Sequence, residues 1–434
     1  MSAAAAPAGG PPGGWTPYVL RFFSYGTWGV LYPFLPVWLL AGDRLTAGQT
    51  GLVVGGAVLA NRLGSLLFVK VLRPGSERAF VIGSQLVMAA VAGALCLAGL
   101  AGLRAVGGWL LLAVVFGLAG SLATLAQLTL IVHQFDPAQT RSAFSYENIA
   151  LNAAGGLAPL LSSLVLTVSE PLYPLAPLPF ALVGVVLATR LAVRPGPPPA
   201  AAGATAQRRA ARPVVAVLLA ANFLTTLAYA QFYGVFSAYA TPELGVRRIG
   251  LLFAVASVAI VALQSLVTRW TRGLGEPALV LLANLAMAAG TGLLVAVGTG
   301  MPVLLVAVLA ITLGEMVYGP VYQTLAVNVS GGRPALAIGA LTFVWGVAES
   351  LAVVAGLALV GAGLGPLSFL GGALGCLAVV ALVTAGRRHF AAMAVPAEPS
   401  ADGPSAVDPS ATGLRPDAGA VEAPETTAPA PVHS

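Results

Sequence analysis

The stretch PVLLVAVLAITLGEMVYGPVYQTLAVN, residues 302–328, is apolar apart from a few polar side chains and carries one charge, on Glu315. A membrane helix needs about 20 largely apolar residues to cross about 30 Å of hydrocarbon, so this stretch is long enough to span a bilayer. In the chain of 434 residues, 58% are hydrophobic and 8% are charged, whereas a soluble domain carries about 25% charged residues. The chain therefore cannot cover a water-facing surface of its size. This composition excludes a cytosolic enzyme and a nucleic-acid binder.

Eleven other stretches have a similar length and composition, so the sequence predicts twelve membrane spans. Most are joined by a few residues rich in Gly, Pro or charge, and short connections make neighbouring helices antiparallel. The spans are expected at about residues 17–41, 47–70, 79–102, 106–132, 142–168, 172–193, 214–240, 248–269, 277–298, 302–328, 334–361 and 364–386.

The longest break follows the sixth span, where PGPPPAAAGATAQRRAAR occupies residues 195–212. We therefore expect an all-α integral membrane fold, with twelve transmembrane helices in two pseudo-symmetric six-helix bundles. The bundles should occupy residues 15–194 and 213–388, joined by a cytoplasmic linker at 195–212. Residues 1–14 and the acidic, Pro- and Ala-rich tail at 389–434 cannot build a core and are expected to be disordered.

A weak internal repeat supports the division into two bundles. An offset of 199 residues places Gly51 on Gly250 and Glu77 on Glu276, in the equivalent span of each part. Duplicated six-span halves hold their substrate near the bilayer midplane, at the interface of the two repeats.

Basic residues predict the orientation, because cytoplasmic loops carry an excess of Lys and Arg. With the N-terminus inside, sixteen Lys and Arg residues, Arg21 among them, fall on the cytoplasmic side and four fall outside. Both termini are therefore expected in the cytoplasm, and the protein in the cytoplasmic membrane. The net charge of +6 then reflects topology and implies no nucleic-acid partner.

Two motifs resemble those of a known transporter family. The loop after the second span keeps Arg73 and Gly75 of the pattern G-x-L-A-D-R-x-G-R, while Phe68 and Leu72 replace its first Gly and its Asp. Residues 154–163, AGGLAPLLSS, resemble the fifth-span pattern G-x-x-x-G-P-x-x-G-G, with Pro159 kept and Ala or Ser at each Gly position.

On these motifs the chain resembles the major facilitator superfamily, closest to its drug:proton antiporter branch, over residues 17–388. The resemblance implies alternating access of two six-span halves around a cavity lined by spans 1, 4, 7 and 10. It also assigns a gating role to Arg73, Gly75 and Pro159.

Away from the ends of the predicted spans, four charged residues lie clearly within them: Arg62, Glu147, Glu315 and Glu349. Each charge costs about 2.5–3.5 kcal/mol near the centre of the hydrocarbon, so each is a candidate functional residue. Glu315 lies near the midplane, and Tyr318 and Tyr322 follow it on the same helical face. We interpret Glu315 as a proton or substrate site; the alternative is a structural hydrogen bond to a neighbouring helix.

Glu349 lies near the middle of the eleventh span. By resemblance the second and eleventh spans are neighbours, so an ion pair between Arg62 and Glu349 is possible although their estimated depths differ by about 9 Å. Structural pairing is the favoured role for Arg62, with substrate contact as the alternative. Glu147 lies near the cytoplasmic end of its span beside Arg141, where a long side chain can reach water.

Polar and aromatic residues on the other presumed lining helices complete the candidate site: Tyr25, Trp28 and Tyr32 on span 1, Gln127 on span 4, and Asn222, Tyr229, Gln231 and Tyr233 on span 7. Aromatic stripes of this kind pack against lipid or neighbouring helices more often than they bind ligands. Apolar cavities with a few polar groups nevertheless suit small organic molecules. There is no phosphate-binding Gly-Lys loop and no His/Cys ligand cluster, so we expect no ATP, cofactor or metal, and no enzymatic activity.

The sequence therefore predicts a secondary active transporter that exports a small organic compound in exchange for protons. Two alternatives stay open: a proton-coupled uptake system for a metabolite, and a non-transporting membrane receptor or scaffold. The expected partners are a small-molecule substrate, protons and the lipid bilayer, and the protein is expected to be a monomer.

Overall fold

The structure is a computed structural model, and it describes residues 13–68, 71–72, 75–134, 137–191, 212–330 and 334–386. The predicted disordered N-terminal twelve residues, most of the linker, the tail and Arg73 of the predicted gating motif lie outside the described residues. The described part is built from helices, with bounds α1 Thr16–Gly29, α2 Leu35–Leu40, α3 Ala47–Phe68, α4 Glu77–Leu100, α5 Val106–Gln134, α6 Pro137–Val168, α7 Pro177–Thr189, α8 Arg212–Ala230, α9 Phe236–Leu244, α10 Val246–Thr271, α11 Glu276–Leu293, α12 Met301–Asn328, α13 Pro334–Gly361 and α14 Gly365–Ala385.

Eleven helical segments of the described chain are long and apolar enough to cross a membrane. They correspond to the second to twelfth predicted spans, so the protein is a multi-pass membrane protein. The first predicted span, residues 17–41, is not one continuous helix. That stretch is divided into α1, a 3₁₀ turn over Tyr32–Phe34 and α2, because Pro33 and Pro36 have no backbone N–H to continue an α-helix.

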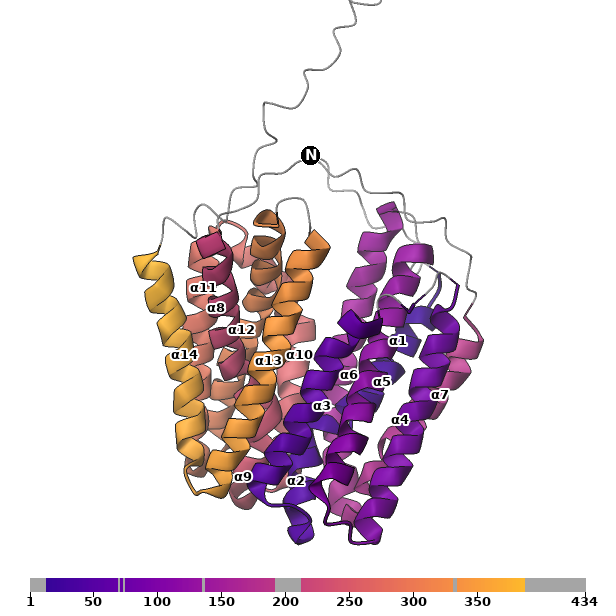
Figure 1. The fold of residues 1–434 in the computed structure, drawn as a ribbon. Coiled ribbons are helices and arrows are strands. Elements are labelled where there is room, and N and C mark those ends of the chain that lie inside the picture. Colours follow the sequence, from indigo (N-terminus) through magenta and orange to yellow (C-terminus); the bar gives the residue numbers. More distant parts are fainter. Residues whose placement is uncertain are drawn as a thin grey trace, which may run out of the picture.

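Helices from the two parts of the sequence lie on opposite sides of the molecule (Figure 1). Helices α1–α7 form one side, and α8 with α10–α14 form the other. The two sides meet where α3 packs against α13 and where α6 packs against α10. Figure 1 shows them closest around α2 and α9, and farther apart toward the C-terminal end of α14.

Glycines allow the close approach of α3 and α13. A Cβ atom on Gly51 would lie 3.0 Å from the carbonyl oxygen of Val354, and one on Gly55 would lie 3.0 Å from that of Ser350. Small residues at helix contacts let backbones approach closely in lipid. The two helices therefore leave little room for a larger side chain at these two positions.

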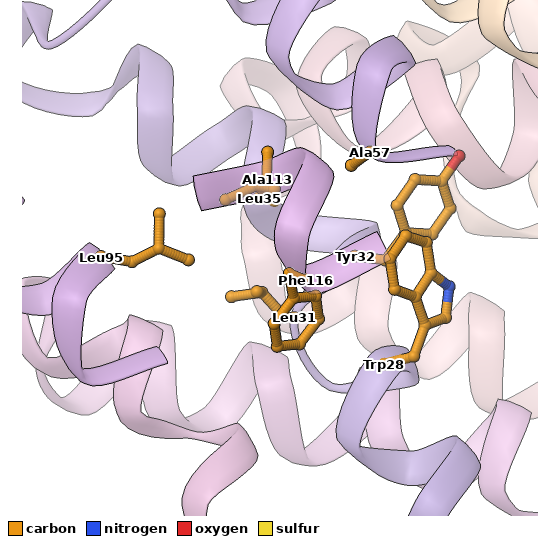
Figure 2. Close-up of a pocket in the computed structure, with 8 residues that line it drawn as sticks. All are labelled: Trp28, Leu31, Tyr32, Leu35, Ala57, Leu95, Ala113 and Phe116. Carbon is orange, nitrogen blue, oxygen red and sulfur yellow. The ribbon is translucent and has the colours of Figure 1, made fainter. Parts of the chain in front are cut away.

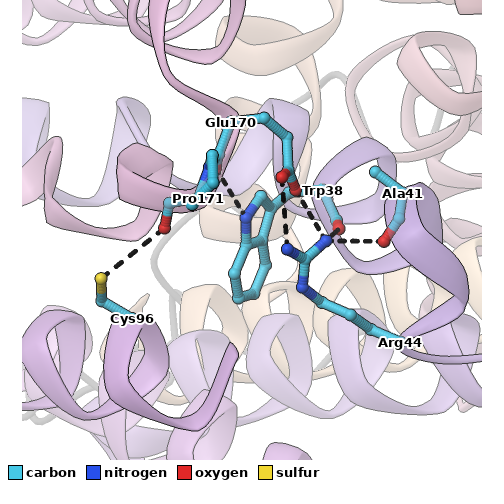
Figure 3. A network of polar contacts seen from close by, with 6 residues as sticks. All are labelled: Trp38, Ala41, Arg44, Cys96, Glu170 and Pro171. Atoms are coloured by element: carbon cyan, nitrogen blue, oxygen red, sulfur yellow. Dashed lines mark hydrogen bonds and ion pairs between the residues drawn. The ribbon is translucent and has the colours of Figure 1, made fainter. Parts of the chain in front are cut away.

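A polar cluster ties the loop after α2 to the segment before α7 (Figure 3). The Arg44 guanidinium forms an ion pair of 2.6 Å with the Glu170 carboxylate and donates to the Ala41 carbonyl at 2.6 Å. It also lies 4.5 Å from the Trp38 ring, and the Trp38 indole N–H donates to the Glu170 carbonyl at 3.0 Å. These contacts fix the end of the molecule where α2 lies.

Candidate functional site

An ion pair between Arg62 and Glu349 joins α3 to α13, and so joins the two parts of the chain. Arg62 Nη2 lies 2.9 Å from Glu349 Oε2, and Arg62 Nε donates to the same oxygen at 3.0 Å. The Trp345 indole N–H also donates to that oxygen at 3.0 Å. The Glu349 side chain is 4% exposed and that of Arg62 is 33% exposed. The ion pair considered from the sequence is thus present in the structure, and the carboxylate is its buried member.

Close helix packing brings the two charges together despite their different estimated depths. A Cβ atom on Gly346 would lie 2.6 Å from Arg62 Cβ, so α13 passes directly beside the stem of the arginine. The guanidinium carbon then lies 5.0 Å from the centre of the Trp345 ring, within the range of a cation–π interaction.

Glu315 lies on α12 and is partly buried. Its Oε2 atom accepts a hydrogen bond of 2.8 Å from the Tyr233 hydroxyl. Among the described residues, no Arg, Lys or His lies within ion-pair distance of Glu315. Glu315 therefore differs from Glu349, because its hydrogen-bond partner is a neutral phenol.

Tyr318 and Tyr322 follow Glu315 along α12, but their hydroxyls form hydrogen bonds with residues of α8. The Tyr318 hydroxyl donates to Asn222 Oδ1 at 2.7 Å and lies 3.0 Å from the Thr226 hydroxyl. The Tyr322 hydroxyl lies 3.0 Å from that of Thr225. No hydrogen bond within the described chain connects either phenol to Glu315, so these phenols form a separate buried network between α8 and α12.

Asn284 on α11 belongs to the same network and did not emerge from the sequence as a candidate. Its Oδ1 atom accepts a hydrogen bond of 2.7 Å from Thr225. The signal that could have found it is simple: Asn284 is a fully buried amide inside an otherwise apolar span, and such a group needs hydrogen-bond partners.

Gln231 begins a π-helical turn over Gln231–Val235, between α8 and α9. Its side chain is buried and accepts a hydrogen bond from the Ser368 hydroxyl on α14. This hydrogen bond joins the π-helical turn to α14, a helix of the same part of the chain.

A second buried ion pair lies among the N-terminal helices and corrects two expectations. Arg21 Nε on α1 lies 2.5 Å from Glu147 Oε1 on α6, and both side chains are nearly inaccessible to solvent. Glu147 is therefore buried and does not reach water, and Arg21 does not lie free on the cytoplasmic side but is buried with it. The physical reason is that two opposite charges inside the membrane stabilise each other by pairing.

Gln127 on α5 belongs to a buried hydrogen-bond network among the N-terminal helices. Its amide donates to the Ser24 hydroxyl at 2.5 Å, and the Gln85 amide of α4 donates to the same hydroxyl at 2.8 Å. Gln85, another residue that the sequence did not single out, accepts a hydrogen bond of 2.8 Å from Thr27. The network joins α1, α4 and α5.

Tyr25 lies on α1, beside the Arg21–Glu147 pair. Its ring centre is 5.7 Å from the Arg21 guanidinium carbon, and its ring edge is 3.8 Å from the position of a Cβ atom on Gly155 of α6. Tyr25 therefore lies at the contact of α1 with α6.

The residues of the two sequence motifs have different surroundings. Gly75 has a φ of +88°, a conformation that glycine adopts without strain. Pro159 lies inside α6, and its carbonyl is 3.5 Å from the position of a Cβ atom on Gly250 of α10. The motif around Pro159 therefore lies at the contact of α6 with α10, while the gating role of these residues stays a prediction.

Two pockets lie away from these charges. A cavity of about 10 Å³ in the N-terminal part is lined by apolar side chains that include Trp28, Leu31 and Phe116 (Figure 2); this is scarcely room for one water molecule. A groove of about 450 Å³ is lined by α4, α5 and Phe68, almost entirely with apolar atoms. Neither pocket contains Glu315, Glu349 or Arg62, so neither carries the candidate chemistry.

Known structures share this fold at low sequence identity. A POT family transporter in complex with 5-aminolevulinic acid matches with a TM-score of 0.71 and 9% identity, over 89% of this chain and 98% of that chain. The nucleoside transporter NupG gives 0.68 and 14%, over 87% and 98%. A D-xylose-proton symporter gives 0.63 and 15%, over 84% and 95%.

A sequence search of curated proteins finds no match. A family profile described as Major Facilitator Superfamily matches residues 18–353, which is more than half of the chain. The match includes α3, α6, α10 and α12, which carry the contacts described above. The protein therefore belongs to the major facilitator superfamily.

Proposed function

We propose that the protein is a secondary active transporter of the cytoplasmic membrane that exports a small organic compound in exchange for protons. The observation that carries this proposal is the pairing of charges inside the described spans. Arg21 is neutralised by Glu147 and Arg62 by Glu349, whereas the hydrogen-bond partner of Glu315 is the phenol of Tyr233.

Glu315 is then the acid whose charge a proton can remove. A carboxylate paired with arginine already has a counter-charge, so protonating it would leave the arginine without its partner, at a cost. A carboxylate without a cation becomes neutral when it binds a proton, and ionisable groups of this kind mark proton pathways in membrane proteins. We therefore assign the proton to Glu315 and a structural or gating role to the two ion pairs.

The position of the Arg62–Glu349 pair supports alternating access. The pair joins α3 to α13, helices from different parts of the chain, so a rocking motion of one part against the other must rearrange it. Rigid-body motion that repacks interface ion pairs is a known type of conformational switch. A non-transporting scaffold gives no reason to keep such charges in the membrane.

The proposal includes the topology. Residues 15–194 and 213–388 form two six-span bundles, with the broken segment of α1 and α2 counted as the first span. Both termini face the cytoplasm, because the excess of basic residues lies on that side even when Arg21 is removed from it. Tyr25, Gln127, Asn222, Gln231, Tyr318 and Tyr322 either contact substrate or hold the helices that do, and the protein acts as a monomer.

The test is transport by the purified protein in liposomes with an imposed pH gradient. The compound is chosen beforehand by a susceptibility and accumulation screen in cells that express the intact chain. We expect proton movement coupled to movement of this compound in the opposite direction, and loss of coupling in Glu315→Gln. Retention of pH-driven transport in Glu315→Gln would contradict the proposed mechanism, and movement of both species in the same direction would establish uptake.

A further inference from the structure

The hydrogen bond to Glu315 comes from the π-helical turn Gln231–Val235, which interrupts a long span between α8 and α9. Single π-helical turns inside α-helices are rare and are frequent at functional sites. This turn carries Tyr233, the residue that donates to Glu315.

Contacts from three directions hold the turn in place. A Cβ atom on Gly234 would collide with Val353 of α13 and would lie 2.9 Å from the Tyr32 hydroxyl. On the side of α14, Gln231 accepts a hydrogen bond from Ser368. The orientation of the turn is therefore set by its neighbours.

Aromatic packing then fixes the Tyr233 ring. The Tyr229 ring centre is 4.6 Å away, the Phe232 ring centre is 4.8 Å away, and the Phe253 ring is stacked at 6.0 Å with an interplanar angle of 22°. A ring held by three others has little rotamer freedom. Its hydroxyl is consequently directed at Glu315 Oε2, at 2.8 Å.

We propose that Tyr233 is a positioning residue that sets the pH at which Glu315 exchanges its proton. A phenol O–H donates to a carboxylate oxygen, and a hydrogen bond to the charged form of an acid favours that form. The π-helical turn thus keeps Glu315 ionised to a lower pH than the same carboxyl would be without the phenol. The inference deepens the proposed function, because it rests on Glu315 as the proton carrier.

Few other ionisable groups face Glu315 from the helices around α12. They are the phenols of Tyr25 on α1 and Tyr229 on α8, and Glu349 of α13 with its partner Arg62. On α12 itself, Tyr318 and Tyr322 are engaged with α8. The charged residues of α10 and α11, the two helices packed along α12, lie near helix ends: Arg247, Arg248, Arg269, Arg272 and Glu276.

Infrared spectroscopy of the protein in lipid nanodiscs can test the inference without knowledge of the substrate. The C=O band of a protonated carboxyl group is followed during a pH titration, and the band absent from Glu315→Gln identifies Glu315. We expect Tyr233→Phe to raise the midpoint of this band by about one pH unit, the size of a modest hydrogen bond to a charged group.

Tyr229→Phe is the matched control. Tyr229 has the same side chain one turn earlier and stacks on Tyr233, but no described hydrogen bond joins its hydroxyl to Glu315. Its removal should leave the midpoint within a few tenths of a unit. Glu315→Asp provides a second variant, because the shorter side chain withdraws the carboxyl from the phenol, and it should make the titration insensitive to Tyr233→Phe.

An unchanged midpoint in Tyr233→Phe would overturn the inference, and so would an equal shift in Tyr229→Phe. Either result can occur while Glu315→Gln still abolishes pH-driven transport, in which case the proposed function stands. If Tyr233→Phe shifts the titration midpoint of Glu315 but the Glu315→Gln variant transports normally, Tyr233 does set the pH of protonation, and the assignment of Glu315 as the proton carrier is wrong. The two failures are therefore distinguishable.

Discussion

Among single residues, Glu349 is a buried acid whose carboxylate is paired with one arginine. Its side chain is 4% exposed, and the same oxygen receives Arg62 and Trp345. Removing one member of a buried ion pair costs about 3–5 kcal/mol, because a buried charge is left alone, whereas removing both members costs much less. The two single variants should therefore differ from the double variant.

We expect Arg62→Gln to lower the thermal unfolding midpoint in detergent more than the double variant Arg62→Gln/Glu349→Gln does. Glu349→Gln should be milder than Arg62→Gln, because Arg62 is 33% exposed and its charge can be partly solvated. Arg248→Gln is the control, since Arg248 is an exposed arginine near a helix end. A double-variant midpoint lowered by the sum of the two single-variant shifts would show that the two side chains are not coupled.

The four charges recognised in the sequence show what composition can and cannot predict about the site. A charged residue within an apolar stretch identifies Arg62, Glu315 and Glu349 directly, because placing a charge in lipid costs free energy. Arg21 also lies inside residues 17–41, but near the cytoplasmic end of the span, where a basic residue indicates topology rather than a buried ion pair. Partners such as Tyr233 carry no charge, and only the packed structure selects one tyrosine among several.

Among the helices, proline explains one break and leaves another unexplained. Pro33 and Pro36 are local signals that divide the first span into α1 and α2. The π-helical turn at Gln231–Val235 contains no proline, and contacts of Gly234 with α13 and of Gln231 with α14 hold it. A sequence pattern with helical period cannot predict such a turn, because its cause lies in other helices.

Glycines on different helices should respond differently to the same substitution. Gly156 of α6 faces Ser257 of α10, where an added Cβ would collide with the serine side chain, whereas a Cβ on Gly83 of α4 would meet nothing within 4 Å. We expect Gly156→Ala to lower the stability by about 1–3 kcal/mol through overpacking. Gly83→Ala should be neutral or raise the stability by up to about 1 kcal/mol, because alanine is the better helix former.

Thermal unfolding of both glycine variants in the same detergent measures this difference. Their helical backbone conformation is similar, so the comparison isolates the α6–α10 contact. A midpoint for Gly156→Ala equal to that of Gly83→Ala would mean that α6 and α10 can separate at no cost, against the packing described here.

For the whole molecule, the long linker and the weak repeat predict two groups of helices, but they do not say which helices meet. That α3 lies against α13 and α6 against α10 follows from small residues that face each other across the interface, such as Gly55 with Ser350 and Gly156 with Ser257. Alternating access requires these contacts to change, and a covalent bond across them should stop transport. A bond within one group of helices should not.

Two cysteine pairs of nearly equal geometry make this test. The Cβ position of Gly51 lies 3.5 Å from Leu357 Cβ, between α3 and α13, and that of Gly29 lies 3.3 Å from Ala158 Cβ, between α1 and α6. Both separations are close to those of a disulfide. In a background without Cys96 and Cys376, oxidation of the Gly51→Cys/Leu357→Cys pair should arrest transport in liposomes, and a reductant should restore it. Oxidation of the Gly29→Cys/Ala158→Cys pair should leave at least half of the transport rate, because α1 and α6 move together. If both disulfides arrest transport, or neither does, the moving parts are not the two groups of helices seen in Figure 1.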